Sequence, residues 1–422
     1  MSSPIRSIAI IDPIGDFGIG GYVYELAEGL AANDVRVDVY TNGLSHMKDV
    51  SLPRHHRLLP LLGSPLFRQR RLIRAVLDGS ASLLRSGDSH HRGDLPMVSR
   101  RTRWVTKAGD LLLPIELALY LKKCRYDLIW TQWPEMSRYG IRFWVLCKAL
   151  GMWMVHTVHN VCPHEETSND QALVRRVYEY SNSLIVHSEY SRQELLRMFP
   201  GCNGKTLLIR YGLYTMFPRL EGERRKLRER LSIPEDAVVL LFFGSVRPYK
   251  NIDAVLESMG NRRSENTILV VAGREFGYPD LVPGDPLGRT RRIASALGVL
   301  DRVRLIPGLL DLTATAGLFE MADILLLPYL KSYGSGVLLL GMTFGLHIAA
   351  TKTGGMDEYL REYPACTLLD GSDTESVGEG MGQAIARLLQ RGRPQHFTPH
   401  DLEWRTIAKS TLQSLEARGP AR

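Results

Sequence analysis

The feature that most restricts the fold is an alternation of short β-branched runs with longer helical patterns, a series that occurs twice. Buried strands separated by helices form parallel sheets that are covered on both faces. We therefore expect an α/β protein with two Rossmann-like, doubly wound domains. The expected strands are 5–12, 35–41, 127–132, 152–159 and 183–188 in the first series, and 237–244, 266–273, 303–308, 322–328 and 346–354 in the second.

The length of the chain also indicates two domains, because one hydrophobic core rarely grows to 422 residues. Between 212 and 222 the sequence changes from strand-like to charged and helix-forming, which marks the expected boundary. Near the end of the chain, Trp404, Ile407 and Leu412 form the apolar stripe of a predicted helix. The predicted units are an N-terminal domain (1–215), a C-terminal domain (216–395) and a terminal helix (396–422).

Charge and cysteine content narrow the expected partners and compartment. The net charge is +8, which favours anionic partners such as nucleotide phosphates or lipid head groups. No basic ribbon studded with aromatic residues occurs, so nucleic acid is not an expected partner. The five cysteines form no CxxC pair, and the sequence has no signal-peptide pattern or uncharged run of bilayer length. We therefore expect a cytoplasmic protein.

The stretch LFFGSVRPYKN, residues 241–251, places two cations directly after a buried strand. Its apolar run ends at a glycine and Ser245, and Arg247 and Lys250 follow. Arginine offers a planar fork for phosphate oxygens, and lysine offers a compact point charge. We predict that Arg247 and Lys250 bind a diphosphate; two solvated surface cations are the alternative.

Two later strands also end in glycine-rich turns that begin helices. After 322–328, Ser335 and Gly336 precede an apolar helix whose free N-terminal amides suit a phosphate, although a simple capped turn is the alternative. After 346–354, two glycines precede Asp357 and Glu358. These carboxylates either cap the helix or bind sugar hydroxyls.

The stretch VHTVHNVCPHEE, residues 155–166, follows a strand and so lies at the carboxyl edge of a sheet, where ligands of α/β proteins bind. A neutral imidazole can take a proton from a hydroxyl or hydrogen-bond a sugar. We therefore name His159 and Glu165 as candidate catalytic residues, with a structural histidine as the alternative. A metal site from His156, His159 and His164 is disfavoured because their spacing matches no helical ligand pair, and no metal is expected.

Residues 11–31 form a glycine-rich turn between a strand and a helix. Gly20 and Gly21 suit a close approach of the backbone to an anion, and Asp16 is a third candidate catalytic residue. The glycine spacing does not fit G-x-G-x-x-G, and Asp38 lies inside a strand, so a nucleotide-dependent oxidoreductase is a minor alternative. A tight turn with a purely structural role is the other alternative; the preferred interpretation is a mobile wall of a cleft between the two domains.

Taken in order, these motifs resemble glycosyltransferases of the GT-B fold, in the group that includes bacterial exopolysaccharide and lipopolysaccharide sugar transferases. The resemblance covers nearly the whole chain. Its most specific part is FFGSVRPYKN, which is similar to a Gly-x5-Lys-Asn signature. Other similar segments are GIGGYVYELAEGLA, TVHN, SLIVHSEYSRQEL and GMTFGLHIAATKTGGMDEYL.

The resemblance implies a hexosyltransferase with a cleft between an acceptor domain and a donor domain, and a terminal helix that packs back on the first domain. The donor is a nucleoside diphosphate sugar, UDP- or GDP-linked, and no further cofactor is expected. The residues expected at the diphosphate are Arg247, Lys250, Gly20, Gly21, Ser335 and Gly336. Those expected at the sugar or nucleoside are Ser245, Asn251, Gly273, Arg274, Tyr333 and Glu358.

One departure from the family pattern affects the expected chemistry. Many relatives carry a Glu-x7-Glu pair where this chain has Ser332 and Leu340, neither of which ionises. Both an inverting and a retaining reaction therefore stay open, and inversion needs a base from Asp16, His159 or Glu165. The missing pair also motivates an alternative: a catalytically weak or inactive scaffold that binds sugar nucleotides. Fixed cations would take the place of a metal at the departing diphosphate.

Segment 66–123 places arginines among aliphatic residues, which is typical of a basic amphipathic surface on an anionic bilayer. This pattern predicts a peripheral protein on the inner face of the plasma membrane, acting on a saccharide or a lipid-linked saccharide. A helix face packed on its own domain is the alternative.

Overall fold

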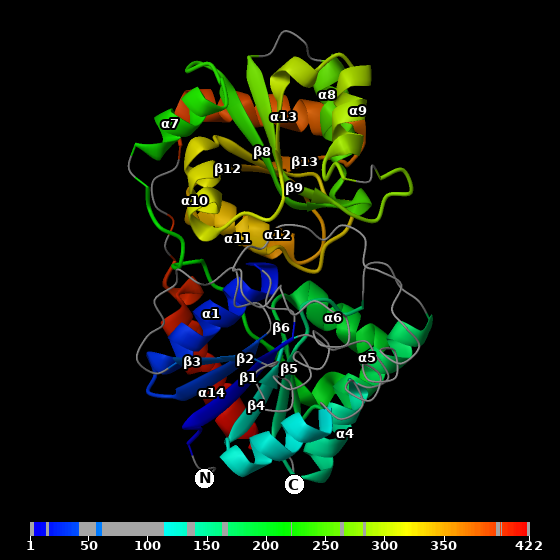
Figure 1. Cartoon of the computed structure of the whole chain (residues 1–422), viewed down its shortest axis with the longest axis vertical. Helices are drawn as coiled ribbons and strands as arrows, with labels where there is room; N and C mark the ends of the chain where they lie inside the picture. The colour runs from blue at the N-terminus through cyan, green and yellow to red at the C-terminus, as the bar shows by residue number, and fades with distance from the viewer. Residues whose placement is uncertain are drawn as a thin grey trace, which may run out of the picture.

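The computed structural model describes residues 4–13, 17–41, 56–60, 114–132, 140–162, 168–220, 222–261, 266–281, 284–393, 397 and 399–419. Within these residues the chain forms two α/β domains, drawn one above the other in Figure 1. Each contains one parallel sheet with helices on both faces, so the predicted fold class is confirmed.

The first sheet has seven parallel strands in the order β3-β2-β1-β4-β5-β6-β7. Its strands are β1 (Ser7–Asp12), β2 (Arg36–Thr41), β3 (His56–Pro60), β4 (Leu128–Thr131), β5 (Met154–Thr157), β6 (Ser183–Val186) and β7 (Thr206–Leu208). The helical elements around it are α1 (Phe17–Ala31), α4 (Ile141–Ala149), α5 (Ser168–Tyr180), α6 (Glu189–Met198) and η2 (Pro200–Lys205). The sequence analysis missed β3, which is short and has no β-branched residue; β7 overlaps LLIRYG (207–212), which resembles the family's linker strand.

The second sheet has six parallel strands in the order β10-β9-β8-β11-β12-β13. Its strands are β8 (Val238–Val246), β9 (Thr267–Glu275), β10 (Val303–Pro307), β11 (Ile324–Leu327), β12 (His347–Thr351) and β13 (Cys366–Leu369). The helical elements are α7 (Glu223–Arg230), η3 (Pro248–Lys250), α8 (Ile252–Asn261), α9 (Gly288–Ala296), η4 (Leu300–Arg302), α10 (Leu312–Met321), α11 (Gly336–Thr343), α12 (Met356–Leu360) and α13 (Thr374–Arg391).

Both sheets add strands first on one side of their first strand and then on the other. In the second sheet β8 lies between β9 and β11, so the order reverses there. Ligands of open α/β sheets bind in the crevice that forms at such a reversal, outside the carboxyl ends of the strands. The segments that follow β8 and β11 are therefore the places to look for a site.

The segment between the two sheets is held by a carboxylate of the first domain. Glu25 of α1 is fully buried and accepts hydrogen bonds from the amide of Met216, at 2.8 Å, and from the amide and hydroxyl of Thr215. Burial raises the pKa of Glu25 to about 7. The predicted domain boundary, between 215 and 216, falls at this attachment.

The last helix, α14 (Trp404–Arg418), follows η5 (His400–Leu402) and returns to the first domain, where Figure 1 shows it in red beside the blue α1. The two helices pack closely, because a Cβ on Gly29 would lie 2.4 Å from the carbonyl oxygen of Trp404. The Trp404 indole donates a hydrogen bond to the Leu213 carbonyl at 2.6 Å. Trp404, Ile407 and Leu412 are buried, as the sequence predicts.

Among the helices whose residues are described, none combines the length and apolar character that a bilayer crossing needs. Most of the basic segment 66–123 lies outside the described residues. Its last part, 114–123, is helical and exposes Leu119 and Tyr120.

Candidate active site

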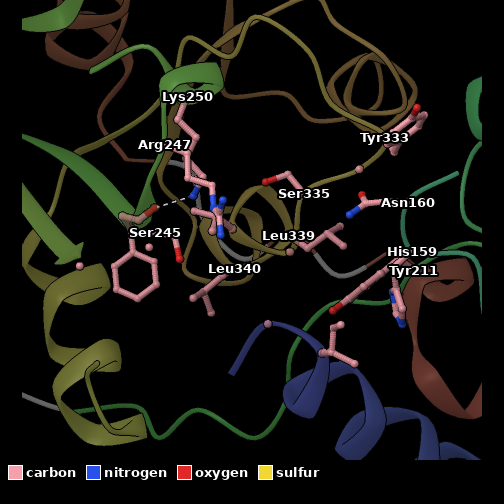
Figure 2. Close-up of a pocket in the computed structure, with 18 of the residues that line it drawn as sticks. His159, Asn160, Tyr211, Ser245, Arg247, Lys250, Tyr333, Ser335, Leu339 and Leu340 are labelled. Carbon is pink, nitrogen blue, oxygen red and sulfur yellow. Dashed lines mark hydrogen bonds between the residues drawn. The ribbon is translucent and has the colours of Figure 1, made fainter. Parts of the chain in front are cut away.

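A cavity of about 680 Å³ lies between the two domains, at the carboxyl ends of β8, β9 and β10. Figure 2 shows cationic side chains on one side of this cavity, with His159 and Asn160 across from them. The first domain contributes Gly18, Ile19, His159, Asn160, His187 and Ser188. The second domain contributes Ser245, Arg247, Lys250, Gly273, Arg274, Tyr333, Ser335 and Gly336, all of them predicted site residues.

Lys250 is a buried cation at the reversal point of the second sheet. Only 6% of the residue is exposed, and its Nζ donates a hydrogen bond to the Phe243 carbonyl at 3.3 Å, the dashed line in Figure 2. Burial, followed by the positive charge of Arg247, lowers the pKa of Lys250 to about 8. An anion bound beside this amine would relieve both effects, so the site is suited to phosphate.

Arg247 and Arg274 extend the positive charge along the cavity. Both guanidinium groups lie over the ring of Phe276, with their Cζ atoms 5.2 Å and 5.4 Å from its centre. Cation–π contacts of this kind hold a guanidinium in place without neutralising it. Among the described residues that line the cavity, none is aspartate or glutamate. The cavity therefore presents three cations and no described carboxylate.

The N-terminus of α11 adds a further attraction for anions. Ser335 caps this helix by accepting a hydrogen bond from the Leu338 amide at 3.2 Å. Ser335, Arg247 and Lys250 line the same cavity and are drawn together in Figure 2, so the positive end of the helix dipole faces the cavity that both cations line. At Gly336 a Cβ would lie 2.8 Å from the Tyr214 hydroxyl, so a larger residue does not fit there.

Three glycines form a floor without side chains across the ends of β8, β9 and β10. Gly244 pairs with Gly273 in the sheet, and the Gly308 amide donates a hydrogen bond to the Gly273 carbonyl at 2.8 Å. A Cβ on Gly273 would lie 1.9 Å from the Gly244 carbonyl oxygen, and its φ of +148° also favours glycine. A Cβ on Gly308 would meet nothing within 4 Å, so the space above it is open.

His159 forms part of the opposite wall, directly after β5. Its Nε2 lies 3.2 Å from the Gln132 Oε1, and its ring packs edge-on against Tyr22. Burial, and then the neighbouring histidines His187 and His156, hold the pKa of His159 well below its usual value. The imidazole is therefore neutral at pH 7 and able to exchange hydrogen bonds with a hydroxyl group.

Glu358 does not line the cavity. Its two carboxylate oxygens accept hydrogen bonds from the amides of Glu189 and Tyr190, both at 2.9 Å, and so cap α6 of the other domain. The next residue, Tyr359, accepts a hydrogen bond from the Tyr211 amide and donates one to the His187 carbonyl. The structure therefore places Glu358 in the seam between the domains, where helix capping uses both of its oxygens.

Three other predicted residues also lie outside the cavity lining. Gly20 and Gly21 are buried within α1, where a Cβ on Gly21 would lie 3.1 Å from the Tyr214 ring; Gly18 and Ile19 line the cavity instead. Asn251 ends η3 with a φ of +63°, and its amide donates a hydrogen bond to the Ser372 carbonyl at 2.6 Å. The contacts of Gly21 and Asn251 give these two residues a structural role.

The remaining catalytic candidates, Asp16 and Glu165, lie outside the described residues. Of the two positions that depart from the family pattern, Leu340 lines the cavity, whereas Ser332 is buried behind it and donates a hydrogen bond to the Gly334 carbonyl. His156 is buried and hydrogen-bonded to Thr131. Within the described ranges, no three His, Cys, Asp or Glu side chains gather as metal ligands would.

Several lining residues were missed by the sequence analysis. Phe276, Leu309 and Leu310 follow β9 and β10, and the only signal for them was a glycine near the end of each strand, Gly273 within β9 and Gly308 after β10. Tyr211 and Tyr214 come from the segment between the domains, and their hydroxyls lie 2.6 Å apart. The apolar character of these residues gave no reason to single them out.

The two Rossmann-like domains with a cavity between them are those of a class of glycosyltransferases. Residues 17–212 match the family model described as a glycosyl transferase 4-like domain, and residues 223–391 match that of glycosyl transferases group 1. The chain belongs to these glycosyltransferases and has the GT-B fold.

Individual relatives are distant. A D-inositol 3-phosphate glycosyltransferase of Streptosporangium roseum is 24% identical over 393 residues, which cover 88% of this chain and 80% of the relative. A second such enzyme, from Catenulispora acidiphila, is 26% identical over 59% of this chain and 60% of its own length. The structure of Anabaena HepE in complex with UDP and glucose aligns with a TM-score of 0.68 at 14% identity, covering 97% of this chain and all of the other.

Proposed function

We propose that this glycosyltransferase moves a hexose from a UDP- or GDP-linked donor to a saccharide or lipid-linked saccharide during surface polysaccharide synthesis. The observation that carries the donor part is the meeting of Lys250, Arg247 and the N-terminus of α11 at the reversal point of the second sheet. A diphosphate bound there would neutralise a cavity in which no described lining residue is a carboxylate.

The arrangement of the cavity favours one orientation of the donor. The diphosphate lies at Lys250 and α11, and the transferred sugar must reach the acceptor side, where His159 lies. The nucleoside then extends in the other direction, over the glycine floor of Gly244, Gly273 and Gly308. A floor without side chains suits a flat base, and the apolar side chains of Leu309 and Leu310 border it.

The chemical step separates charge, because the diphosphate gains negative charge as its bond to the sugar breaks. Lys250, Arg247 and the amides of α11 are fixed before the reaction and oppose that charge without reorganisation. In this proposal no metal and no further cofactor is needed. Of the three candidate bases, only His159 lies among the described residues, and its neutral imidazole can hold or accept the proton of the attacking hydroxyl. Inversion and retention both stay open.

A test is sugar transfer and donor hydrolysis by the purified chain with a panel of UDP- and GDP-sugars. We expect Lys250→Ala and Arg247→Ala each to lower the rate about a hundredfold, the typical cost of losing one fixed group that stabilises transition-state charge. Lys226→Ala is the matched control, because this exposed lysine of α7 pairs with Glu223. Full activity in Lys250→Ala would contradict the proposal.

A second candidate is the scaffold that binds sugar nucleotides without turnover. It is favoured by Ser332 and Leu340, which stand where many relatives have glutamates, and by the lack of a carboxylate among the described lining residues. Donor binding by calorimetry with no turnover of any donor would support it. The acceptor and the peripheral membrane location stay predictions, since they rest on a segment that lies mostly outside the described residues.

A further inference from the structure

Arg274 is the cation of the cavity that the diphosphate does not require. A diphosphate diester carries two negative charges, and Lys250 and Arg247 supply two positive ones. Arg274 is exposed, and the side-chain contact that it makes within the described part of the chain is a cation–π contact with the ring of Phe276. Its guanidinium shares this ring with that of Arg247, each Cζ lying within 5.4 Å of the ring centre. It is therefore held in place and able to bind a ligand group other than the diphosphate.

The strand order places Arg274 beside the nucleoside. Its strand, β9, lies between β8, which ends at the diphosphate site, and β10, which Gly308 follows directly. Arg274 pairs with Ser245 in the register of β8 and β9, and both residues line the cavity. A nucleoside lying on the glycine floor between β8 and β10 passes this side chain. The base is thus a part of the donor within its reach.

We infer that Arg274 determines which nucleobase the donor carries. Its guanidinium donates hydrogen bonds and accepts none, so it binds carbonyl oxygens and leaves an amino group without a partner. Uracil and guanine carry a carbonyl at the position where cytosine and adenine carry an amino group. Arg274 therefore favours UDP over CDP and GDP over ADP. This inference rests on the proposed function, which supplies the nucleoside diphosphate.

Phe276 makes this selection effective. A free arginine side chain has many rotamers, and ordering it on binding reduces the affinity that its hydrogen bonds provide. The stacking of Arg274 on Phe276 restricts those rotamers before the donor arrives. The ring also contacts Arg247, so one aromatic side chain supports both the group that binds the diphosphate and the group that contacts the base.

The test is isothermal titration calorimetry of the full chain with UDP, CDP, GDP and ADP. We expect the wild type to bind UDP about tenfold more tightly than CDP, and GDP about tenfold more tightly than ADP, in the range known for arginine–base pairing. Arg274→Ala should bring both ratios close to one. Arg274→Lys keeps the charge but loses the planar fork, and should give intermediate ratios. Arg291→Ala, which removes an exposed arginine paired with Asp285, should leave them unchanged.

Each other outcome has a distinct meaning. Equal affinities within each pair in the wild type, or ratios that survive in Arg274→Ala, would overturn the inference and leave the proposed function standing. An equal loss of affinity for inorganic pyrophosphate and for UDP in Arg274→Ala would also overturn it, because Arg274 would then be a phosphate ligand. A wild type that binds none of the four nucleotides would instead overturn the proposed function itself. Melting temperatures of all variants check that they are folded.

Discussion

Replacing Lys250 with methionine should stabilise the protein while abolishing its binding of the donor. Lys250 is buried, and its pKa falls from 10.5 to about 8, first because of burial and then because of Arg247. Below pH 8 the amine is charged in both the folded and the unfolded chain, so folding must desolvate a cation. At 1.36 kcal/mol per pH unit, this pKa difference corresponds to roughly 3 kcal/mol.

The sign of the pH dependence follows from the two pKa values. Between pH 8 and 10.5 the unfolded chain binds the proton and the folded chain does not, so stability rises with pH in this window. The free-energy cost of burying the charged Lys250 amine is therefore fully present at pH 7. Lys250→Met removes it and keeps an apolar stem of similar length, so the variant should unfold at a higher urea concentration than the wild type at pH 7, with a smaller difference at pH 10.

Ligand binding provides an independent measurement on the same amine. A diphosphate beside Lys250 raises its pKa, so at pH 8, where about half of the free molecules are neutral, binding should take up about half a proton. Calorimetry of UDP binding in buffers with different ionisation enthalpies measures this uptake. The exposed Lys226, replaced in the same way, serves as the control.

Two results would refute this reasoning. One is binding of UDP at pH 8 without proton uptake, which would mean that the diphosphate does not lie against Lys250. The other is a Lys250→Met variant that is less stable than the wild type at pH 7, which would mean that contacts such as the hydrogen bond to Phe243 outweigh the cost of the buried charge.

The packing of the strand ends and of the domain seam leads to two further predictions, both measured by urea denaturation. Gly273→Ala should lose about 3 kcal/mol or more, because its Cβ would overlap the Gly244 carbonyl oxygen. Gly308→Ala also places a side chain at a positive φ, +106°, but has open space at its Cβ and should lose less; equal losses would contradict this. Glu358→Ala should lose about 1 kcal/mol through the cap of α6, and more than Glu362→Ala, which removes an exposed ion pair with Arg210. The reverse order would show that the cap contributes little.

The parts of the site that the sequence predicted are those fixed by local chain geometry. Arg247 and Lys250 come within four residues of the end of β8, and Ser335 caps the helix that follows β11; parallel strands bring such ends to one edge of a sheet. Their position follows from the strand pattern alone. The apolar stripe of the terminal helix was also predictable, because the spacing of its apolar residues along the sequence matches the period of an α-helix.

The parts that the sequence did not predict depend on how distant segments meet. Glu358 follows two glycines as a sugar ligand might, but the approach of α6 from the other domain determines what its oxygens bind. Asn251 belongs to a signature motif, yet its amide reaches the Ser372 carbonyl, which is remote in sequence. Phe276 contributes to the site because its ring contacts two arginines, Arg247 after β8 and Arg274 in β9. None of these partners is encoded by local spacing.

The return of α14 to α1 has a consequence for how the protein forms during synthesis. The first domain lacks one of its covering helices until residues 404–418 have left the ribosome, so Gly29 and its neighbours on α1 stay uncovered while the second domain is being made. The second domain has all its strands before that moment and can fold earlier. The half of the molecule that is translated first is therefore the half that is completed last.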